Sequence, residues 1–361
     1  MSNLSRNAQP VAVSTNEALH NSNIFDIIRH IAALAVLFSH HYAFSGLSEP
    51  KVFGITKLGT FSVVVFFSIS GYLITQSYLR TSSPYSYFKK RISRIFPALI
   101  VCSLIMTMLV CTIFGKADWQ SYLASKEAIT NFIYYSFFGA HAAPEQINYF
   151  SSNYIYKDAL NGSLWTLFFE FFDYMLIALF IFNKSRPITS ISALLIGSII
   201  IQVATKLGLP TNYYIDRATI LTIPFAIGGI LFLTKEYWYR KKIGIVLIIF
   251  AIIAAFFSQE NDERSILFFS STAILTVIIG NAFKDTLISG RFDFSYGIYI
   301  YAYPTQQIII NETGLGFWAS LSLSAIITIL LANFSWFFIE KKFIQKKRTP
   351  PTTIITHHQP S

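Results

Sequence analysis

A few ionisable side chains lie within otherwise apolar stretches of the sequence. Arg29 and His40 are eleven residues apart, a spacing that puts both on one face of an α-helix, about 16 Å apart along its axis. Glu170 lies near the start of another apolar stretch, and counting the rise per residue from the outer end of each stretch puts it at a depth similar to that of His40. A neutral imidazole can move protons in a low-dielectric site, and a carboxylate beside it can fix its tautomer. We therefore predict that His40 is a catalytic general base and that Glu170 orients it.

Each of these residues also has a purely structural interpretation. Arg29 could be an interfacial anchor paired with Asp26, one turn earlier on the same helix face. His40 could mark the outer boundary of the membrane, and Glu170 could be a packing residue whose carboxylate is held by neighbouring hydroxyl groups.

Two further arginines, Arg91 and Arg94, are three residues apart and share a helix face. Their guanidinium groups could form a fork that binds a phosphate group at the cytoplasmic surface. The alternative is that they only set the orientation in the membrane or bind lipid phosphates.

The composition excludes most soluble proteins. Of the 361 residues, 53% are hydrophobic and only 13% are charged, and the mean hydropathy is +0.50. A soluble globule of this length cannot bury so much apolar surface. The two cysteines, Cys102 and Cys111, are too far apart on a helix to form a disulfide, so neither a disulfide framework nor a metal site is expected.

Apolar segments long enough to cross a bilayer recur along the chain. We predict an all-α membrane protein with ten transmembrane helices, at residues 24–45, 58–79, 95–114, 164–182, 188–207, 218–234, 243–258, 265–281, 294–311 and 317–339. Residues 128–140 are apolar but too short to cross, which indicates an interfacial or re-entrant helix. The loop 115–163, rich in Tyr, Asn and Ser, could recognise a polar partner outside the cell.

The placement of the basic residues sets the orientation. Most of the 28 lysines and arginines fall between the segments on one side, which places both termini in the cytoplasm by the positive-inside rule. The net charge of +10 is spread over these loops instead of forming one patch, so no nucleic-acid partner is expected. We expect one membrane domain at residues 23–343, between disordered cytoplasmic segments at 1–22 and 344–361.

At these residues the chain resembles the membrane acyltransferase type 3 family, bacterial proteins that transfer acyl groups, usually acetyl, to sugars of surface polysaccharides. The similarity covers most of the chain and rests on five motifs in order. They are Asp26-x-x-Arg29 with His40, the Phe66–Thr75 stretch FFSISGYLIT, the Arg91–Pro97 stretch RISRIFP, the Asn161–Glu170 stretch NGSLWTLFFE, and Ser295–Tyr299 with Pro304, Trp336 and Glu340. Many members carry a histidine two residues before the proline, where this chain has Ala302, so a second imidazole is not expected there.

The resemblance implies an acetyl-CoA or other acyl-CoA donor on the cytoplasmic side and an acceptor on the outer side of the bacterial inner membrane. Arg29, Arg91 and Arg94 would bind the donor phosphates, and His40 would act as general base or as a transient acyl carrier. Trp165, Tyr299 and Tyr303 are the candidate substrate-binding residues, although aromatic residues in membrane helices mostly serve packing. The expected acceptor is a surface glycan such as lipopolysaccharide O-antigen, exopolysaccharide or a lipid-linked oligosaccharide, with no metal ion.

Two other function classes stay open. Deep Arg, His and Glu residues also suit a permease or flippase for a polar or lipid-linked solute. A structural subunit of an envelope assembly is a third possibility. Against a carrier stands the absence of an evident internal repeat.

Overall fold

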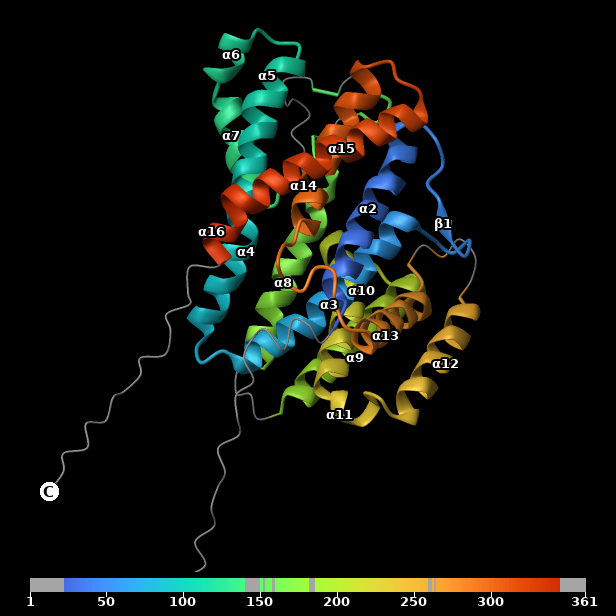
Figure 1. Ribbon diagram of the computed structural model, residues 1–361. Helices are drawn as coiled ribbons and strands as arrows, with labels where there is room; N and C mark the ends of the chain where they lie inside the picture. The colour runs from blue at the N-terminus through green and yellow to red at the C-terminus, as the bar shows by residue number, and fades with distance from the viewer. Residues whose placement is uncertain are drawn as a thin grey trace, which may run out of the picture.

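A computed structural model describes residues 23–344 except 140–149, 152, 158–159, 182–185, 259–261 and 263. Within these residues the chain folds as a bundle of helices with one short hairpin (Figure 1). Of the two predicted disordered segments, 1–22 lies outside the described residues, and so does 345–361. Ile344 still belongs to the last helix, so this helix extends one residue into the predicted tail.

The longer helices are α2 (Phe25–Phe44), α3 (Leu58–Arg80), α4 (Pro84–Leu104), α8 (Trp165–Phe180), α9 (Pro187–Lys206), α10 (Tyr213–Leu233), α12 (Lys242–Phe256), α13 (Ile266–Ala282), α14 (Ser295–Glu312) and α15 (Phe317–Ser335). The shorter helices are α5 (Cys111–Phe114), α6 (Trp119–Leu123), α7 (Lys126–Ser136), α11 (Lys235–Trp238) and α16 (Lys341–Ile344). Two π-helical stretches, Ile105–Val110 and Trp336–Glu340, and a 3₁₀ turn, Gly162–Leu164, complete the helical elements.

The described residues contain seven helical segments long and apolar enough to cross a membrane, and each coincides with a predicted span. They are Phe25–Phe44, Leu58–Arg80, Pro84–Phe114, Gly162–Phe180, Pro187–Lys206, Tyr213–Leu233 and Phe317–Ile344. The other three predicted spans are also helical, as α12, α13 and α14. The first two of these are shorter than a full span, and α14 carries many Tyr and Gln residues. The structure therefore confirms the prediction of an all-α membrane protein, whereas the number of ten spans stays a prediction.

The packing of α3 against α10 depends on glycine. A Cβ atom at Gly71 would overlap the carbonyl oxygen of Phe225, and one at Gly228 would overlap the carbonyl oxygen of Ser68. Small residues at these positions let the two backbones approach closely, as is common between membrane helices. This contact fixes α3, the helix that carries much of the candidate site.

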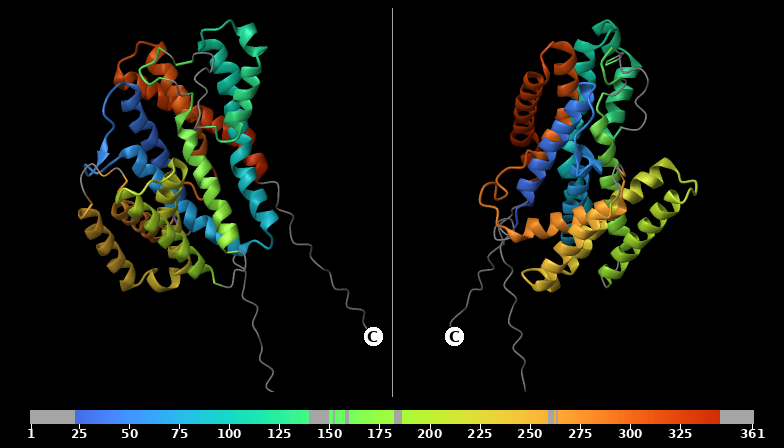
Figure 2. Two further views of the ribbon diagram at one scale, coloured as in Figure 1. Left: turned by 180° about the vertical axis from the view of Figure 1, so that it is seen from behind. Right: turned by 90° about the vertical axis from the view of Figure 1, so that its right-hand side faces the viewer.

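Helices α2 and α13 pack against α3, and α9 and α13 pack against α10. Figures 1 and 2 show α5, α6 and α7 at one end of the molecule and α9, α11 and α12 at the opposite end. Helix α7, which covers most of the predicted interfacial segment, packs on α4. A short antiparallel hairpin, β1 (Lys51–Val52) and β2 (Thr56–Lys57), follows α2 and turns through Gly54 in the left-handed region.

Candidate active site

A cavity of about 120 Å³ lies between α2, α3, α4, α8 and α14. Five of the eight predicted site residues line it, namely Arg29, Arg91, Arg94, Glu170 and Tyr299. These residues come from four helices, α2, α4, α8 and α14, so the fold brings distant parts of the sequence to one place. His40, Trp165 and Tyr303 do not line this cavity.

Glu170 is held by two hydroxyl groups inside the cavity. The Ser70 hydroxyl on α3 donates to its Oε1 atom, and the Tyr174 hydroxyl, one turn further along α8, donates to the same atom at 2.5 Å. The contact predicted between Glu170 and His40 is not found. Helix α3 lies between α2 and α8, so the carboxylate meets Ser70 instead of the imidazole. Counting the rise per residue from the sequence gives the depth of Glu170 and of His40 in the membrane. It does not reveal that α3 packs between the two helices that carry them.

His40 lies near the opposite end of α2 from Arg29, among aromatic rings. Its ring centroid is 5.6 Å from that of Phe44 and 5.8 Å from that of Tyr303. Nδ1 of the imidazole is buried and has no hydrogen-bond partner among the described residues. The neighbouring charged groups are Glu49 and Lys57 of the segment that follows α2.

Glu49 was not among the predicted site residues. Its carboxylate accepts a hydrogen bond of 2.8 Å from Ser39, the residue before His40, and pairs with Lys57 at 3.2 Å. In the sequence it stands in a short polar loop beside Pro50, which gives no signal of proximity to the imidazole.

The second acid that sequence reasoning missed is Asp293, directly before α14. Its Oδ2 atom lies 2.5 Å from Nη2 of Arg94 and 3.2 Å from Nη2 of Arg29. Burial would raise the pKa of Asp293, but the two guanidinium groups and the hydrogen bond from Ser295 outweigh it and hold the pKa of this carboxyl well below its usual range. The sequence did contain a signal that an acid such as Asp293 should be near, because two arginines at membrane depth need counterions.

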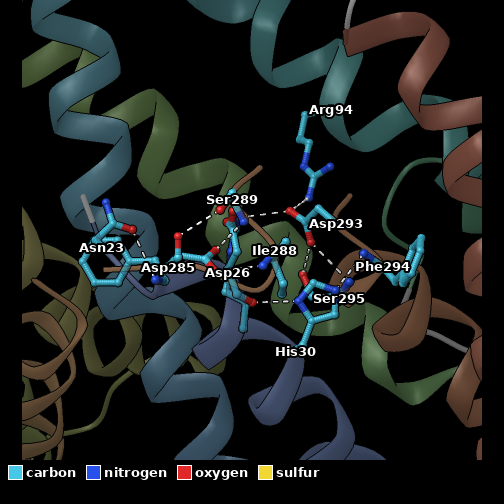
Figure 3. A network of polar contacts seen from close by, with 12 residues as sticks. Asn23, Asp26, His30, Arg94, Asp285, Ile288, Ser289, Asp293, Phe294 and Ser295 are labelled. Atoms are coloured by element: carbon cyan, nitrogen blue, oxygen red, sulfur yellow. Dashed lines mark hydrogen bonds and ion pairs between the residues drawn. The ribbon is translucent and has the colours of Figure 1, made fainter. Parts of the chain in front are cut away.

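The same ionic cluster includes two further acids. Arg29 also pairs with Asp26, and Arg94 also lies 3.5 Å from the Glu340 carboxylate. His30 accepts a hydrogen bond from the Phe294 backbone N–H through Nε2, so its Nδ1 proton donates to the Asp26 carbonyl oxygen. Figure 3 shows His30, Asp26, Asp293 and Arg94 gathered around the start of α14.

Arg91 differs from the other two arginines. Among the residues that the structure describes, it pairs with no carboxylate, and its only polar contact is to the Ser77 hydroxyl at 3.5 Å. Its guanidinium lies 6.0 Å from the centre of the Tyr174 ring. The predicted fork of Arg91 and Arg94 therefore lines one cavity, but of the three arginines there only Arg91 has no ion-pair partner among the described residues.

The three candidate substrate-binding residues, Tyr299, Tyr303 and Trp165, lie in three different environments. The Tyr299 hydroxyl donates to the Ser163 carbonyl oxygen at 2.9 Å and borders the cavity. Tyr303, one turn further along α14, contacts His40. Trp165 lies apart from both, against the guanidinium of Arg217 at 5.9 Å.

Comparison with known proteins gives consistent results. The family model described as "Acyltransferase domain" matches residues 23–339. The chain is 33% identical to the O-acetyl transferase of Shigella phage Sf6, over 91% of this chain and 98% of that protein. It is 27% identical to Nodulation protein 10 of Rhizobium leguminosarum bv. viciae, over 91% of this chain and 95% of that protein. No solved structure matches the chain significantly.

Proposed function

Because this chain belongs to the membrane acyltransferase type 3 family and is an O-acetyltransferase, we propose that it transfers an acetyl group from cytoplasmic acetyl-CoA to a sugar hydroxyl of a surface glycan. The expected acceptors are O-antigen, exopolysaccharide or a lipid-linked oligosaccharide. The proposal includes ten membrane spans, both termini in the cytoplasm and a location in the bacterial inner membrane.

One observation carries the donor side of this proposal: Arg91 lines a cavity inside the bundle without a carboxylate partner among the described residues. A guanidinium with free donors is suited to phosphate groups, which an acyl-CoA supplies. Arg29 and Arg94 line the same cavity, but Asp26, Asp293 and Glu340 already neutralise them. We therefore assign the main donor contact to Arg91 and a supporting role to the other two.

The acyl-CoA supplies an activated acyl group as a thioester. On the acceptor side, His40 removes the proton from the sugar hydroxyl as the oxygen attacks the thioester carbonyl. The C–O bond of the new ester forms, the C–S bond breaks, and coenzyme A leaves as a thiolate that takes up the proton from the His40 imidazolium. Because Nδ1 of His40 is buried, we assign the proton transfer to Nε2. Glu170 belongs to the donor cavity in this scheme, where Ser70 and Tyr174 hold it in place.

The arginines proposed to bind the donor and the proposed general base His40 lie at different depths in the helix bundle. His40 follows Arg29 by eleven residues on α2, about 16 Å along the helix axis, so the acyl group must extend from the arginines toward His40. Tyr299 and Tyr303, one turn apart on α14, lie between the cavity and the imidazole. This separation supports a donor bound from one side of the membrane and an acceptor from the other.

The test uses the purified chain in detergent with acetyl-CoA labelled in the acetyl group. The acceptor probe is the glycan released by mild acid from cells in which the gene has been deleted. We expect label in the glycan as an alkali-labile ester, and no label without the protein. Transport of the glycan across vesicles without covalent label would instead support a permease or flippase and would contradict the proposal.

A further inference from the structure

His40 and four other residues, Tyr303, Phe44, Tyr156 and Gln307, are joined by a series of contacts. The His40 ring contacts Tyr303, Tyr303 contacts Phe44 with centroids 4.6 Å apart, and Phe44 contacts Tyr156 at 5.5 Å. The carbonyl oxygen of Tyr156 then accepts a hydrogen bond of 2.9 Å from Nε2 of Gln307. Gln307 follows Tyr303 by four residues on α14, so it lies on the same face of that helix.

Three polar atoms of these five residues are buried without partners among the described residues. They are Nδ1 of His40, Oη of Tyr303 and Oε1 of Gln307, and Gln307 is 0% exposed. The Gln307 amide is oriented by its donation to Tyr156, so Oε1 is the atom left to accept a hydrogen bond. A buried amide oxygen without a donor is unfavourable, and such groups normally have a partner.

The group of five residues around His40 also reaches the surface of the protein. Tyr156 is 47% exposed, although its ring packs on Phe44. The segment 153–157 that carries it is fastened to α14 at two further points: Asn311 accepts a hydrogen bond from the Ile155 backbone N–H, and Glu312 accepts one from the Tyr154 hydroxyl at 2.6 Å. An exposed aromatic ring beside a buried hydrogen-bond acceptor and an imidazole matches a sugar, which has an apolar face and hydroxyl donors.

We propose that Gln307 is a specificity-determining residue that accepts a hydrogen bond from a hydroxyl group of the acceptor sugar, while the Tyr156 ring packs against the face of that sugar. This inference rests on the proposed function, because it deepens the acceptor side of the same site. The ligand class is a neutral polyhydroxylated ring.

The experiment compares Gln307→Leu with Asn311→Leu as a matched control. Both variants remove an amide that fastens segment 153–157 to α14, but Oδ1 of Asn311 is already occupied by the Ile155 N–H. We measure KM for the glycan fragment, KM for acetyl-CoA, and thermal unfolding in detergent. We expect Gln307→Leu to raise the glycan KM about tenfold more than Asn311→Leu does, with the acetyl-CoA KM within twofold of wild type.

A second variant keeps the proposal testable if Gln307→Leu does not fold. Tyr156→Leu changes a half-exposed side chain, and we expect it to raise the glycan KM several-fold. Equal glycan KM values for Gln307→Leu and Asn311→Leu, or an unchanged value in Tyr156→Leu, would overturn the proposal. Saturation-transfer NMR of the same glycan fragment measures binding without transfer. It therefore still tests the Gln307 site if wild-type protein transfers no acetyl, a result that would count against the proposed function alone.

Discussion

The carboxylate of Asp293 lies 2.5 Å from the guanidinium of Arg94 and 3.2 Å from that of Arg29. These three residues come from the segment before α14, from α4 and from α2, so one acid connects this segment to two helices beside the cavity. The two arginines are thereby held by an acid, whereas Arg91, which we propose as the main donor contact, is not.

The first prediction concerns the loss of this shared acid. Asp293→Asn leaves two largely buried guanidinium groups without their common counterion, and breaking such a pair costs about 3 kcal/mol. We expect a clear fall in the unfolding temperature in detergent and a loss of transfer activity. Asp262→Asn is the control, because the pair of Asp262 with Lys206 is exposed and contributes little.

The pH dependence of that effect follows from the lowered pKa of Asp293. A carboxyl whose pKa is lower in the folded protein stabilises it above the unfolded pKa, roughly 4, and loses this contribution as the pH falls through the folded value. The difference in unfolding free energy between wild type and Asp293→Asn should therefore persist from about pH 5 to pH 9, and any variation within this range comes from Glu340, the other acid that pairs with Arg94. A difference that disappears near pH 7 would contradict the ionised state of Asp293.

The second prediction concerns Arg91. Arg91→Gln removes the one arginine charge in the cavity that has no ion-pair partner among the described residues, so we expect the KM for acetyl-CoA to rise about 10- to 100-fold, as for the loss of a charge-assisted hydrogen bond. The glycan KM should change little, because we propose that the acceptor binds at the His40 end. Lys89→Gln is the matched control, since Lys89 is exposed on the same helix and does not line the cavity. The same rise in both variants would indicate only a general effect of basic charge at this surface.

Comparison of sequence and structure shows what patterns can and cannot predict. Apolar runs located the helices because each must satisfy its backbone internally and span the bilayer. Arg29, Arg91 and Arg94 line one cavity, and Glu170, which is predicted to lie beside His40, lines the same cavity. The pairing of Glu170 with His40 did not follow, because depth along a helix says nothing about which helix packs between two others. Asp293 and Glu49 were missed because they lie outside the predicted spans, where an acid looks like an ordinary loop residue.

The third prediction concerns His40. His40→Ala removes the proposed general base, and such assistance is typically worth about 10² to 10⁴ in rate. We therefore expect turnover to fall by that factor while the binding of acetyl-CoA, measured by equilibrium dialysis, stays within twofold of wild type. Transfer at the normal rate by a folded His40→Ala protein would remove His40 from the mechanism.

The fourth prediction separates Glu170 from His40. In Glu170→Gln the side-chain oxygen can still accept hydrogen bonds from Ser70 and Tyr174, so the protein should fold. Because no hydrogen bond joins Glu170 to His40, the acidic limb of the pH–rate profile should keep its midpoint even if the rate falls. A midpoint displaced by a full pH unit would show that the carboxylate acts on the imidazole after all.

The fifth prediction tests the helix contact that positions the cavity. A Cβ at Gly71 would overlap the backbone of α10 at Phe225, and a backbone atom cannot move aside as a side-chain end can. Overpacking of this kind costs about 1 to 3 kcal/mol or more, so Gly71→Ala should unfold at a lower temperature in detergent and accumulate poorly in membranes. Gly197→Ala is the control, because no atom lies within 4 Å of its added Cβ and alanine favours the helix by up to about 1 kcal/mol. If both variants unfold at the wild-type temperature, α3 and α10 do not pack through Gly71, and the cavity that α3 lines must be held in place by other contacts.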